Sequence, residues 1–223
     1  GIIQILWDRK WRFDLNLFLS ISIKHWSDLL PNLAISLEQI QDELYDFFRH
    51  RIISLLEDCS FDNDIVQAVI SSIVLTKDIC LDPQDIFIRA SLLMNMRSAG
   101  KLDSLHAVVT RASRLALKSS LPFENVEPRN NVDPTLFEKQ SEHEMFNLLI
   151  KLEPIVKSNS EERYQLLSNC LTDSSKQLSN FFDGDDSVMV MSENLELRNN
   201  RLNLLAILRN QSLVIADFSK ISN

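Results

Sequence analysis

Apolar residues recur every three or four positions along most of the chain, which is the spacing of one face of an α-helix. The clearest run lies between residues 37 and 57, where the apolar positions are Leu37, Ile40, Leu44, Phe47, Phe48, Ile52 and Leu55. Ser36 and Gln39 stand at its start with the spacing of a capping box. The pattern therefore predicts a long helix from Leu37 to about Glu57.

Start signals of the same kind predict three more helices before residue 120. Asp62 or Asn63 can cap the first, and Asp82 is placed to cap the second, which ends at Gly100. The third begins at about Asp103, and its predicted buried face consists of Leu105, Val108, Val109, Ala112 and Leu115.

Polar residues and prolines interrupt the helical pattern at 121–134, which is the best linker candidate in the chain. Its prolines are Pro122, Pro128 and Pro134. Asp133 with the proline after it gives a helix cap followed by a first-turn proline, and the helix so predicted is stopped by Pro154. The sequence thus predicts two helical groups, 1–120 and 135–223, as parts of one composite domain.

The second group continues the same apolar periodicity. Ser160 is placed to cap a segment whose stripe consists of Tyr164, Leu167, Leu171, Leu178 and Phe181. The last helix is predicted from about Asn194 to Gln211, with inward positions at Leu195, Leu202, Leu205 and Leu208. The strand-like "SVMVM" is too short to form a sheet, and there is no repeat of fixed period. The expected fold class is all-α, an irregular helical bundle.

Composition narrows the chemistry that the chain can support. With only 3 glycines in 223 residues, glycine-rich phosphate loops are nearly excluded. A formal net charge of -8 argues against a general polyanion binder, because phosphate contacts need Lys and Arg. A local basic face is still possible.

The strongest candidate for such a face is the helix that begins near Asp103. Arg111, Arg114 and Lys118 follow i, i+3, i+7 spacing and form one stripe, and Arg97 and Lys101 are close in sequence. These five residues are the candidates for contact with RNA phosphates. The plain alternative is a solvated helix flank.

Cysteines and tryptophans give weaker signals. Cys59, Cys80 and Cys170 are widely spaced without a CxxC pair, which favours reduced thiols in a cytosol-like compartment, buried as small apolar residues. Three tryptophans lie near basic residues, as in single-stranded nucleic-acid binders, although core positions are the favoured interpretation: Trp7, Trp11 and Trp26.

Catalytic and metal-binding templates do not fit the sequence. The four histidines are scattered without a zinc-binding spacing, and "DGDD" at 183–186 lacks the remainder of a calcium loop, so it is interpreted as an acidic turn. No nucleophile motif or nucleotide loop occurs. We therefore expect no catalytic residue, cofactor or metal ligand.

The apolar opening "GIIQILW" is too short for a membrane span and is followed at once by charged residues. The first residue is not Met, so the chain is interpreted as a fragment of a longer protein, trimmed upstream, with no membrane association.

A family resemblance rests on the C-terminal region. The order of Phe181, Phe182 and Asp183, then "VMVM", then Arg198, Asn200 and Arg201 within "LRNNRLNLL", resembles the C-terminal end of the beta subunit of bacterial-type heterotetrameric glycyl-tRNA synthetase. Weaker similarities, such as "YDFFRHRIISLLED" and "HAVVTRASRLALK", extend over nearly the whole chain. Two features depart from the family pattern: His50 stands where an acidic residue is expected, and residues 185–187 are extra relative to shorter members. The longer form resembles cyanobacterial or plastid versions.

The resemblance implies a helical anticodon-binding region of the kind found in arginyl-type class I synthetases. It implies tRNA-Gly, the alpha subunit and the rest of the beta subunit as partners, in an assembly of two alpha and two beta chains. The alpha subunit would use ATP to attach glycine to tRNA, in the cytoplasm or a plastid stroma. A helical protein-interaction module without RNA contact is the alternative.

The motif residues have two candidate roles. The favoured role is structural: Phe181, Phe182, Asp183, Arg198, Asn200 and Arg201 would fix the "FFD...VMVM" hairpin on the last helix. An arginine there could bind the acidic turn or Glu193 through charge-assisted hydrogen bonds. Direct tRNA contact by Arg198 or Arg201 is the other possibility.

Overall fold

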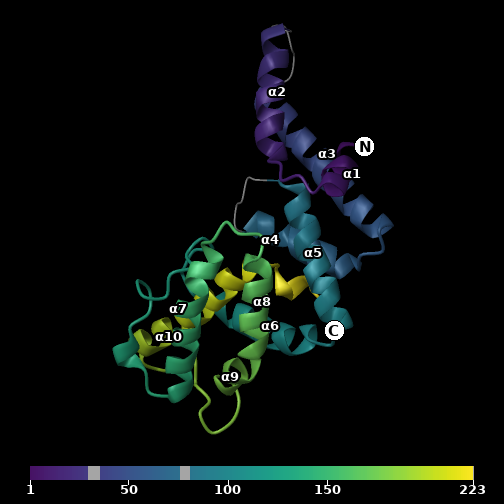
Figure 1. Cartoon of the computed structure of the whole chain (residues 1–223). Helices are drawn as coiled ribbons and strands as arrows, with labels where there is room; N and C mark the ends of the chain where they lie inside the picture. The colour runs from purple at the N-terminus through teal and green to yellow at the C-terminus, as the bar shows by residue number, and fades with distance from the viewer. Residues whose placement is uncertain (30–35, 76–80, 223) are drawn as a thin grey trace. The chain divides into compact units, whose positions relative to one another are not determined.

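The computed structural model describes residues 1–29, 36–75 and 81–222, and within these ranges all regular structure is helical (Figure 1). The predicted all-α class is confirmed. The chain divides into two compact units, Gly1–Met94 and Asn95–Asn223. The segment 121–134 lies within the second unit, so its role as a boundary between helical groups stays a prediction.

The first unit is built from α1 (Ile2–Arg9), α2 (Leu15–Leu29), α3 (Leu37–Asp58), α4 (Asn63–Leu75) and most of α5 (Pro83–Ser98). Two predicted caps are confirmed. Ser36 Oγ accepts from the backbone N–H of Gln39 at 3.1 Å, and Asp82 Oδ1 accepts from that of Gln84 at 2.9 Å. These caps satisfy donors that a helix start leaves free, and so fix where α3 and α5 begin.

One face of α2 is buried and the other is exposed. Leu15, Leu19 and Ile23, spaced four apart, belong to the core, and α2 packs against α3. The remaining large apolar side chains of α2 that are exposed are Leu17, Phe18, Ile21, Trp26 and Leu29. The unit therefore presents an apolar surface to solvent, which is unusual for a complete soluble domain.

Two interpretations of single residues in this unit are wrong. Trp11 and Trp26 are 60% and 62% exposed rather than buried, because each lies on the side of its segment away from the core. Cys59, after the end of α3, is also exposed, whereas Cys170 is half-buried and Cys80 lies outside the described residues. Trp7 is partly buried and donates its indole N–H to the carbonyl of Pro83 at 2.8 Å.

The second unit contains the C-terminal end of α5 and then α6 (Leu102–Ala116), η1 (Pro134–Leu136), α7 (Gln140–Val156), α8 (Arg163–Asp173), α9 (Ser175–Asn180), α10 (Leu195–Leu213) and η2 (Phe218–Lys220). Helix α10 packs against both α6 and α7, and α7 in turn packs against α8 and α9. Almost the whole of α10 from Asn200 to Leu213 is buried, so it forms the core of this unit.

Side chains of α10 hold the segment 121–134. Asn210 Nδ2 donates to the carbonyls of Pro122 and Asn125 at 2.8 and 2.6 Å, and Gln211 Nε2 donates to that of Val126 at 2.9 Å. These amides supply the hydrogen bonds that an irregular backbone cannot make with itself. The segment is therefore an integral part of the unit despite its linker-like composition.

Two predicted helix boundaries in this unit are wrong. Asp133 and Pro134 begin only the short 3₁₀ helix η1, and α7 starts at Gln140, where Glu142 Oε2 accepts from the backbone N–H of Lys139 at 3.0 Å. Pro154 does not stop α7, which continues to Val156. Pro154 lacks a backbone N–H, so one carbonyl of the preceding turn loses its hydrogen-bond donor. This is tolerated close to the end of the helix.

The predicted apolar stripe after Ser160 is confirmed in burial, although it spans two helices. Its five members are buried, and α8 and α9 are separated at Ser174. In α10, Leu202, Leu205 and Leu208 are buried as predicted, but Leu195 is 60% exposed. Leu195 is the first residue of the helix, so it lies before the turns that contact α6 and α7.

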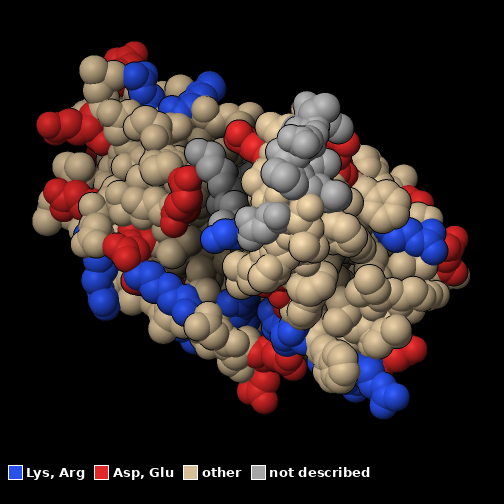
Figure 2. Space-filling model, turned by 90° about the horizontal axis from the view of Figure 1, so that it is seen from above, with Lys and Arg blue, Asp and Glu red and all other residues tan. Residues whose placement is uncertain are grey.

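Charges are mixed on the surface seen in Figure 2, where Lys and Arg lie among Asp and Glu. The net charge of -8 therefore does not form one continuous acidic field on that face. None of the helices in the described ranges combines the length and apolarity that crossing a bilayer requires.

Candidate nucleic-acid interface

The cationic stripe predicted on α6 lies at the surface. Arg111, Arg114 and Lys118 are exposed, while Leu105, Val108, Val109 and Ala112 occupy the buried side of the same helix region. Arg111 and Arg114 share one face of α6 because they are three positions apart, whereas Lys118 lies in the turn after the helix, which ends at Ala116. Lys101, just before α6, is also exposed, and the half-buried Arg97 donates to the carbonyl of Ser222 at 3.4 Å.

One member of the stripe contacts the Phe181–Phe182–Asp183 motif. Arg111 Nη1 lies 2.8 Å from Asp183 Oδ2, and its guanidinium carbon lies 4.7 Å from the centre of the Phe182 ring. The Arg111 and Asp183 side chains are 49% and 63% exposed, so solvent screens the pair and it contributes less than about 1 kcal/mol. A phosphate could therefore replace Asp183 as the partner of Arg111.

The other end of the stripe contacts the same part of the chain. Lys118 Nζ lies 3.9 Å from Met191 Sδ, which is too weak an interaction to fix the ammonium group. The 181–191 segment is also anchored to the core of the second unit. Phe181 is fully buried, and its carbonyl accepts from the backbone N–H of Val188 at 2.9 Å.

Arg201 is buried in a charge network that the sequence did not identify. Its Nε donates to Glu142 Oε1 at 2.8 Å and its Nη2 donates to Glu138 Oε2 at 2.8 Å. Burial alone would lower the pKa of Arg201, but the hydrogen bonds to Glu142 and Glu138 outweigh it and raise the pKa. Arg201 is thus held as a cation inside the unit and is not available to RNA.

The predicted partners of this arginine, the acidic turn and Glu193, are wrong. The arginine that contacts the acidic turn is Arg111, through Asp183, and Ser141 donates its backbone N–H and hydroxyl to Asp186 of the same turn at 2.5 and 2.6 Å. Arg201 contacts the hairpin through the carbonyl of Met189, to which Nη1 donates at 3.1 Å. The "VMVM" segment is therefore held on α10 by a backbone contact.

Asn200 fixes a different segment to the same helix. Its Oδ1 accepts from the backbone N–H of Asp133 at 2.7 Å, and its Nδ2 donates to the carbonyl of Asp133 at 2.9 Å. This two-point bond pairs an amide side chain with a peptide edge. Arg198, two residues earlier, is half-buried.

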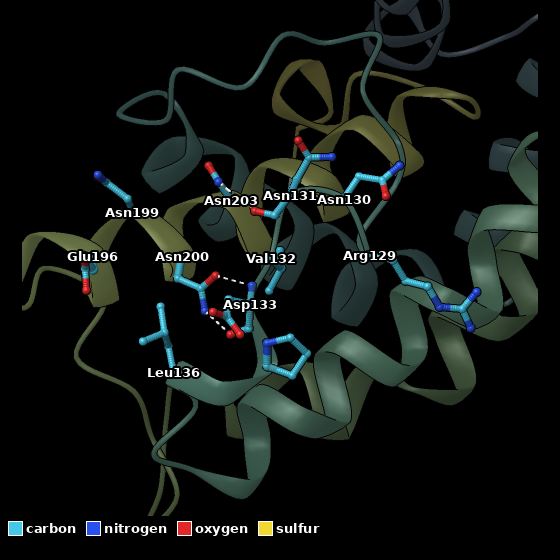
Figure 3. A pocket seen from close by; sticks show the side chains of 11 residues that line it. Arg129, Asn130, Asn131, Val132, Asp133, Leu136, Glu196, Asn199, Asn200 and Asn203 are labelled. Atoms are coloured by element: carbon cyan, nitrogen blue, oxygen red, sulfur yellow. Dashed lines mark hydrogen bonds between the residues drawn. The ribbon is translucent and has the colours of Figure 1, made fainter.

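A polar pocket of about 840 Å³ adjoins this bond (Figure 3). One wall is a stripe of α10 with helical spacing, namely Glu196, Asn199, Asn200 and Asn203. The other wall is residues 129–136. Asn203 Nδ2 donates to the carbonyl of Asn131 at 2.9 Å, so hydrogen bonds join the two walls at two levels.

Sequence reasoning missed this pocket, although a signal was present. The triplet Arg-Asn-Asn occurs twice, at 129–131 and 198–200. Because almost seventy residues separate the triplets, the sequence does not show that the asparagines of both line one pocket, together with Arg129 but without Arg198. Elsewhere in the described ranges, no group of acidic, His or Cys side chains is arranged to hold a metal ion.

Comparisons with known proteins agree with the resemblance. Residues 105–213 match the family described as DALR anticodon binding domain. The chain is 38% identical over 225 residues to the glycine–tRNA ligase beta subunit of Gloeothece citriformis, and 32% identical over 232 residues to that of Synechocystis sp.. These alignments cover 99% of this chain but only 31% and 32% of the two relatives.

A more distant beta subunit, from Clostridioides difficile, is 28% identical over 225 residues and is covered over 29% of its length. The chain therefore spans about a third of the length of the curated relatives that it matches. The residues matched to the anticodon-binding family run from α6 to the end of α10 and contain both the cationic stripe and the pocket.

Proposed function

We propose that the chain binds tRNA-Gly, because residues 105–213 match the DALR anticodon binding domain and the whole chain is similar to glycine–tRNA ligase beta subunits. The observation that carries the proposal is the exposed stripe of Arg111, Arg114 and Lys118 within the matched residues. Arginine and lysine at this spacing can follow successive phosphates of an RNA backbone. Arg97 and Lys101 extend the proposed track toward the start of α6.

The acidic remainder of the chain supports such a local contact. A net charge of -8 opposes non-specific binding of a polyanion, so RNA contact depends on places where cations gather. The Arg111–Asp183 pair lies at one end of the track and is exposed. Exchange of a carboxylate for a phosphate there keeps the charge of the arginine satisfied.

The test is a titration of the full chain with fluorescent tRNA-Gly and a non-cognate tRNA at several salt concentrations. The double variant Arg111→Ala, Arg114→Ala should weaken binding of tRNA-Gly and lower the slope of log K against log salt by about 1.5, since two phosphate contacts are lost. Lys151→Ala with Lys176→Ala removes the same charge elsewhere in the unit as a control.

If the two double variants weaken tRNA binding equally, the loss of affinity comes from net charge alone. The stripe is then rejected as the contact surface. Absence of salt-sensitive binding to tRNA-Gly by the unaltered chain would reject the function itself. Thermal unfolding of each variant, measured in parallel, excludes loss of the fold as the cause.

For the whole protein we propose ATP-dependent attachment of glycine to tRNA. In that reaction this chain supplies recognition, and the alpha subunit supplies catalysis. The proposed assembly contains two alpha and two beta chains, in the cytoplasm or a plastid stroma. The ligase names of the relatives support this proposal. Reconstitution with an alpha subunit and the remaining beta segment, followed by a glycylation assay, is the direct test.

A second function is favoured by the apolar surface of the first unit. Exposed leucine, isoleucine and tryptophan side chains on α2 suit packing against protein rather than RNA. The chain spans only about a third of its relatives, so the proposed occupant is the remainder of a beta subunit. This interaction is compatible with tRNA binding, because the stripe lies in the other unit.

A further inference from the structure

The pocket between α10 and residues 129–136 is an open hollow in the surface of the second unit, and its lining is mainly polar. Its volume of about 840 Å³ falls within the range of about 300–1,000 Å³ that is usual for sites that bind small molecules. Its walls are fixed by the Asn200–Asp133 and Asn203–Asn131 hydrogen bonds. The pocket therefore exists before any ligand arrives.

Three lining side chains have polar groups that are available to a ligand. Arg129, Glu196 and Asn199 are exposed at the rim, and no other described residue forms a hydrogen bond with their side chains. Figure 3 shows Glu196 and Asn199 on α10, with Arg129 at the far end of the opposite wall. Together they offer a cation, an acceptor-only carboxylate and an amide that both donates and accepts.

This combination selects among ligand classes. Glu196 and Asp133 place two carboxylates in the lining, which disfavours a phosphate group inside the pocket. A planar base edge, which carries donors and acceptors side by side, matches the amide and the carboxylate together. Unpaired bases of an RNA loop are available for such contacts.

The pocket also adjoins the end of the cationic stripe. Ser119, the residue after Lys118, donates its hydroxyl to Asn203 Oδ1 at 3.0 Å, and Asn203 lines the pocket. RNA whose phosphates lie along α6 would therefore reach the pocket wall at the C-terminal end of the stripe. The arrangement joins a phosphate track to an open polar recess that is large enough for a nucleobase.

We infer that this pocket receives one unpaired nucleobase that bears an exocyclic amino group, and the inference rests on the proposed tRNA-binding function. Glu196 accepts from the amino group, and the Asn199 amide pairs with the adjoining ring edge. Cytosine and adenine present an amino group, whereas uracil presents carbonyl oxygens, which a carboxylate repels. Arg129 holds the flanking phosphate at the rim.

The test measures binding of the full chain to tRNA-Gly and to the single-stranded octamers of cytidine, adenosine and uridine, by fluorescence anisotropy. The cytidine and adenosine octamers should bind about tenfold more tightly than the uridine octamer. In the double variant Glu196→Gln, Asn199→Ala the three octamers should bind about equally, while the salt dependence of binding is unchanged. Glu193→Gln, which changes an exposed carboxylate outside the pocket, should keep the preference.

The outcomes separate the two proposals. If the chain binds tRNA-Gly in a salt-sensitive manner but the octamers bind equally, or if the double variant keeps the preference, the pocket inference is wrong and tRNA binding stands. If neither tRNA-Gly nor any octamer binds, both proposals fail. Arg111→Ala with Arg114→Ala should weaken all three octamers by the same factor, because phosphate contacts are independent of the base.

Discussion

Large apolar side chains lie exposed along α2 of the first unit, whereas α10 of the second unit buries arginines and amides. On α2, Leu17 and Ile21 are 57% and 50% exposed. In α10, Arg201 and Asn210 are 3% and 1% exposed. A buried polar group must find partners, so α10 can pack in only one register, whereas an exposed apolar face has to be covered by something else.

The difference teaches where each unit obtains its stability. In the second unit, hydrogen bonds from α10 reach α6, α7, the 121–134 segment and the hairpin around Met189. Arg209 is an example: it stacks at 4.0 Å on the ring of Phe123 and donates to the carbonyl of Ala116 at 3.2 Å, and burial lowers its pKa. Helix α10 is thus hydrogen-bonded to four segments of its own unit, whereas α2 leaves one apolar face exposed.

The largest effect is expected when the buried charge network is broken. Arg201→Ala leaves Glu142, which is fully buried, without its cation, and should lower the free energy of unfolding by about 3–5 kcal/mol. Arg198→Ala, at a half-buried position on the same helix, is the matched control. Chemical denaturation measures both. Equal stability of the two variants, or a loss of tRNA affinity without loss of stability, would contradict the structural role of Arg201.

A smaller effect is expected at Asn200. Asn200→Ala removes two hydrogen bonds to the backbone of Asp133 and should cost about 1–2 kcal/mol of unfolding free energy. The neighbouring exposed Asn199→Ala should leave thermal stability nearly unchanged. If both variants unfold at the same temperature, the amide–backbone bond does not hold the pocket wall.

Substitutions in the exposed apolar face of α2 should change self-association more than stability. Leu17→Ser with Ile21→Ser should change stability by only about 0.5 kcal/mol, since both side chains are exposed, yet reduce self-association of the isolated chain. Leu19→Ser, on the buried side of α2, should instead cost about 2 kcal/mol or more. Sedimentation velocity and thermal unfolding separate the two effects. A monomeric parent chain that stays soluble at high concentration would remove the need for a covering partner.

The smallest expected effect is on the loss of stability at acidic pH. Hydrogen bonds from Lys157 and Asn130, together with the charge of Lys157, lower the pKa of Glu127 below its ordinary value of 4.5. The unfolded chain then binds the proton more tightly, so this stabilisation is present above pH 4.5 and is lost as pH falls through the folded pKa.

The Glu127→Gln variant should therefore show a slightly smaller drop in melting temperature between pH 6 and about pH 3 than the parent chain. The Glu127 side chain is 40% exposed and solvent screens its interaction with Lys157, so the difference is small. Glu193→Gln supplies a control with the same change of charge. An identical acid response in all three proteins would assign the loss of stability to other carboxylates.

Local features of the fold could be predicted because their causes lie within a few residues. Ser36 caps α3 by accepting from the backbone N–H of Gln39, three residues on. Asp82 caps α5 by accepting from that of Gln84, two residues on. The helix signal at Asp133 was misleading because its carboxylate is satisfied by Thr135, two residues on, and closes only a short turn. Burial of stripes such as Leu202 and Leu205 follows directly from the helical period.

Features of the candidate site depend on segments that are far apart in sequence. The partner of Arg201 is Glu142, fifty-nine residues away, and no local pattern connects the two. The pocket likewise requires 129–136 to face α10. By contrast, the exposure of Arg111 and Arg114 could be predicted from spacing on one helix, but the presence of Asp183 beside Arg111 could not.

The bond between Arg201 and the carbonyl of Met189 has an evolutionary consequence. The arginine contacts only the backbone there, and the Met189 side chain is 76% exposed. Many different amino acids should therefore be tolerated at 189, whereas an inserted or deleted residue would carry the carbonyl away from the guanidinium. Substitution of the side chain at 189 should therefore be accepted more readily than a backbone change that moves this carbonyl.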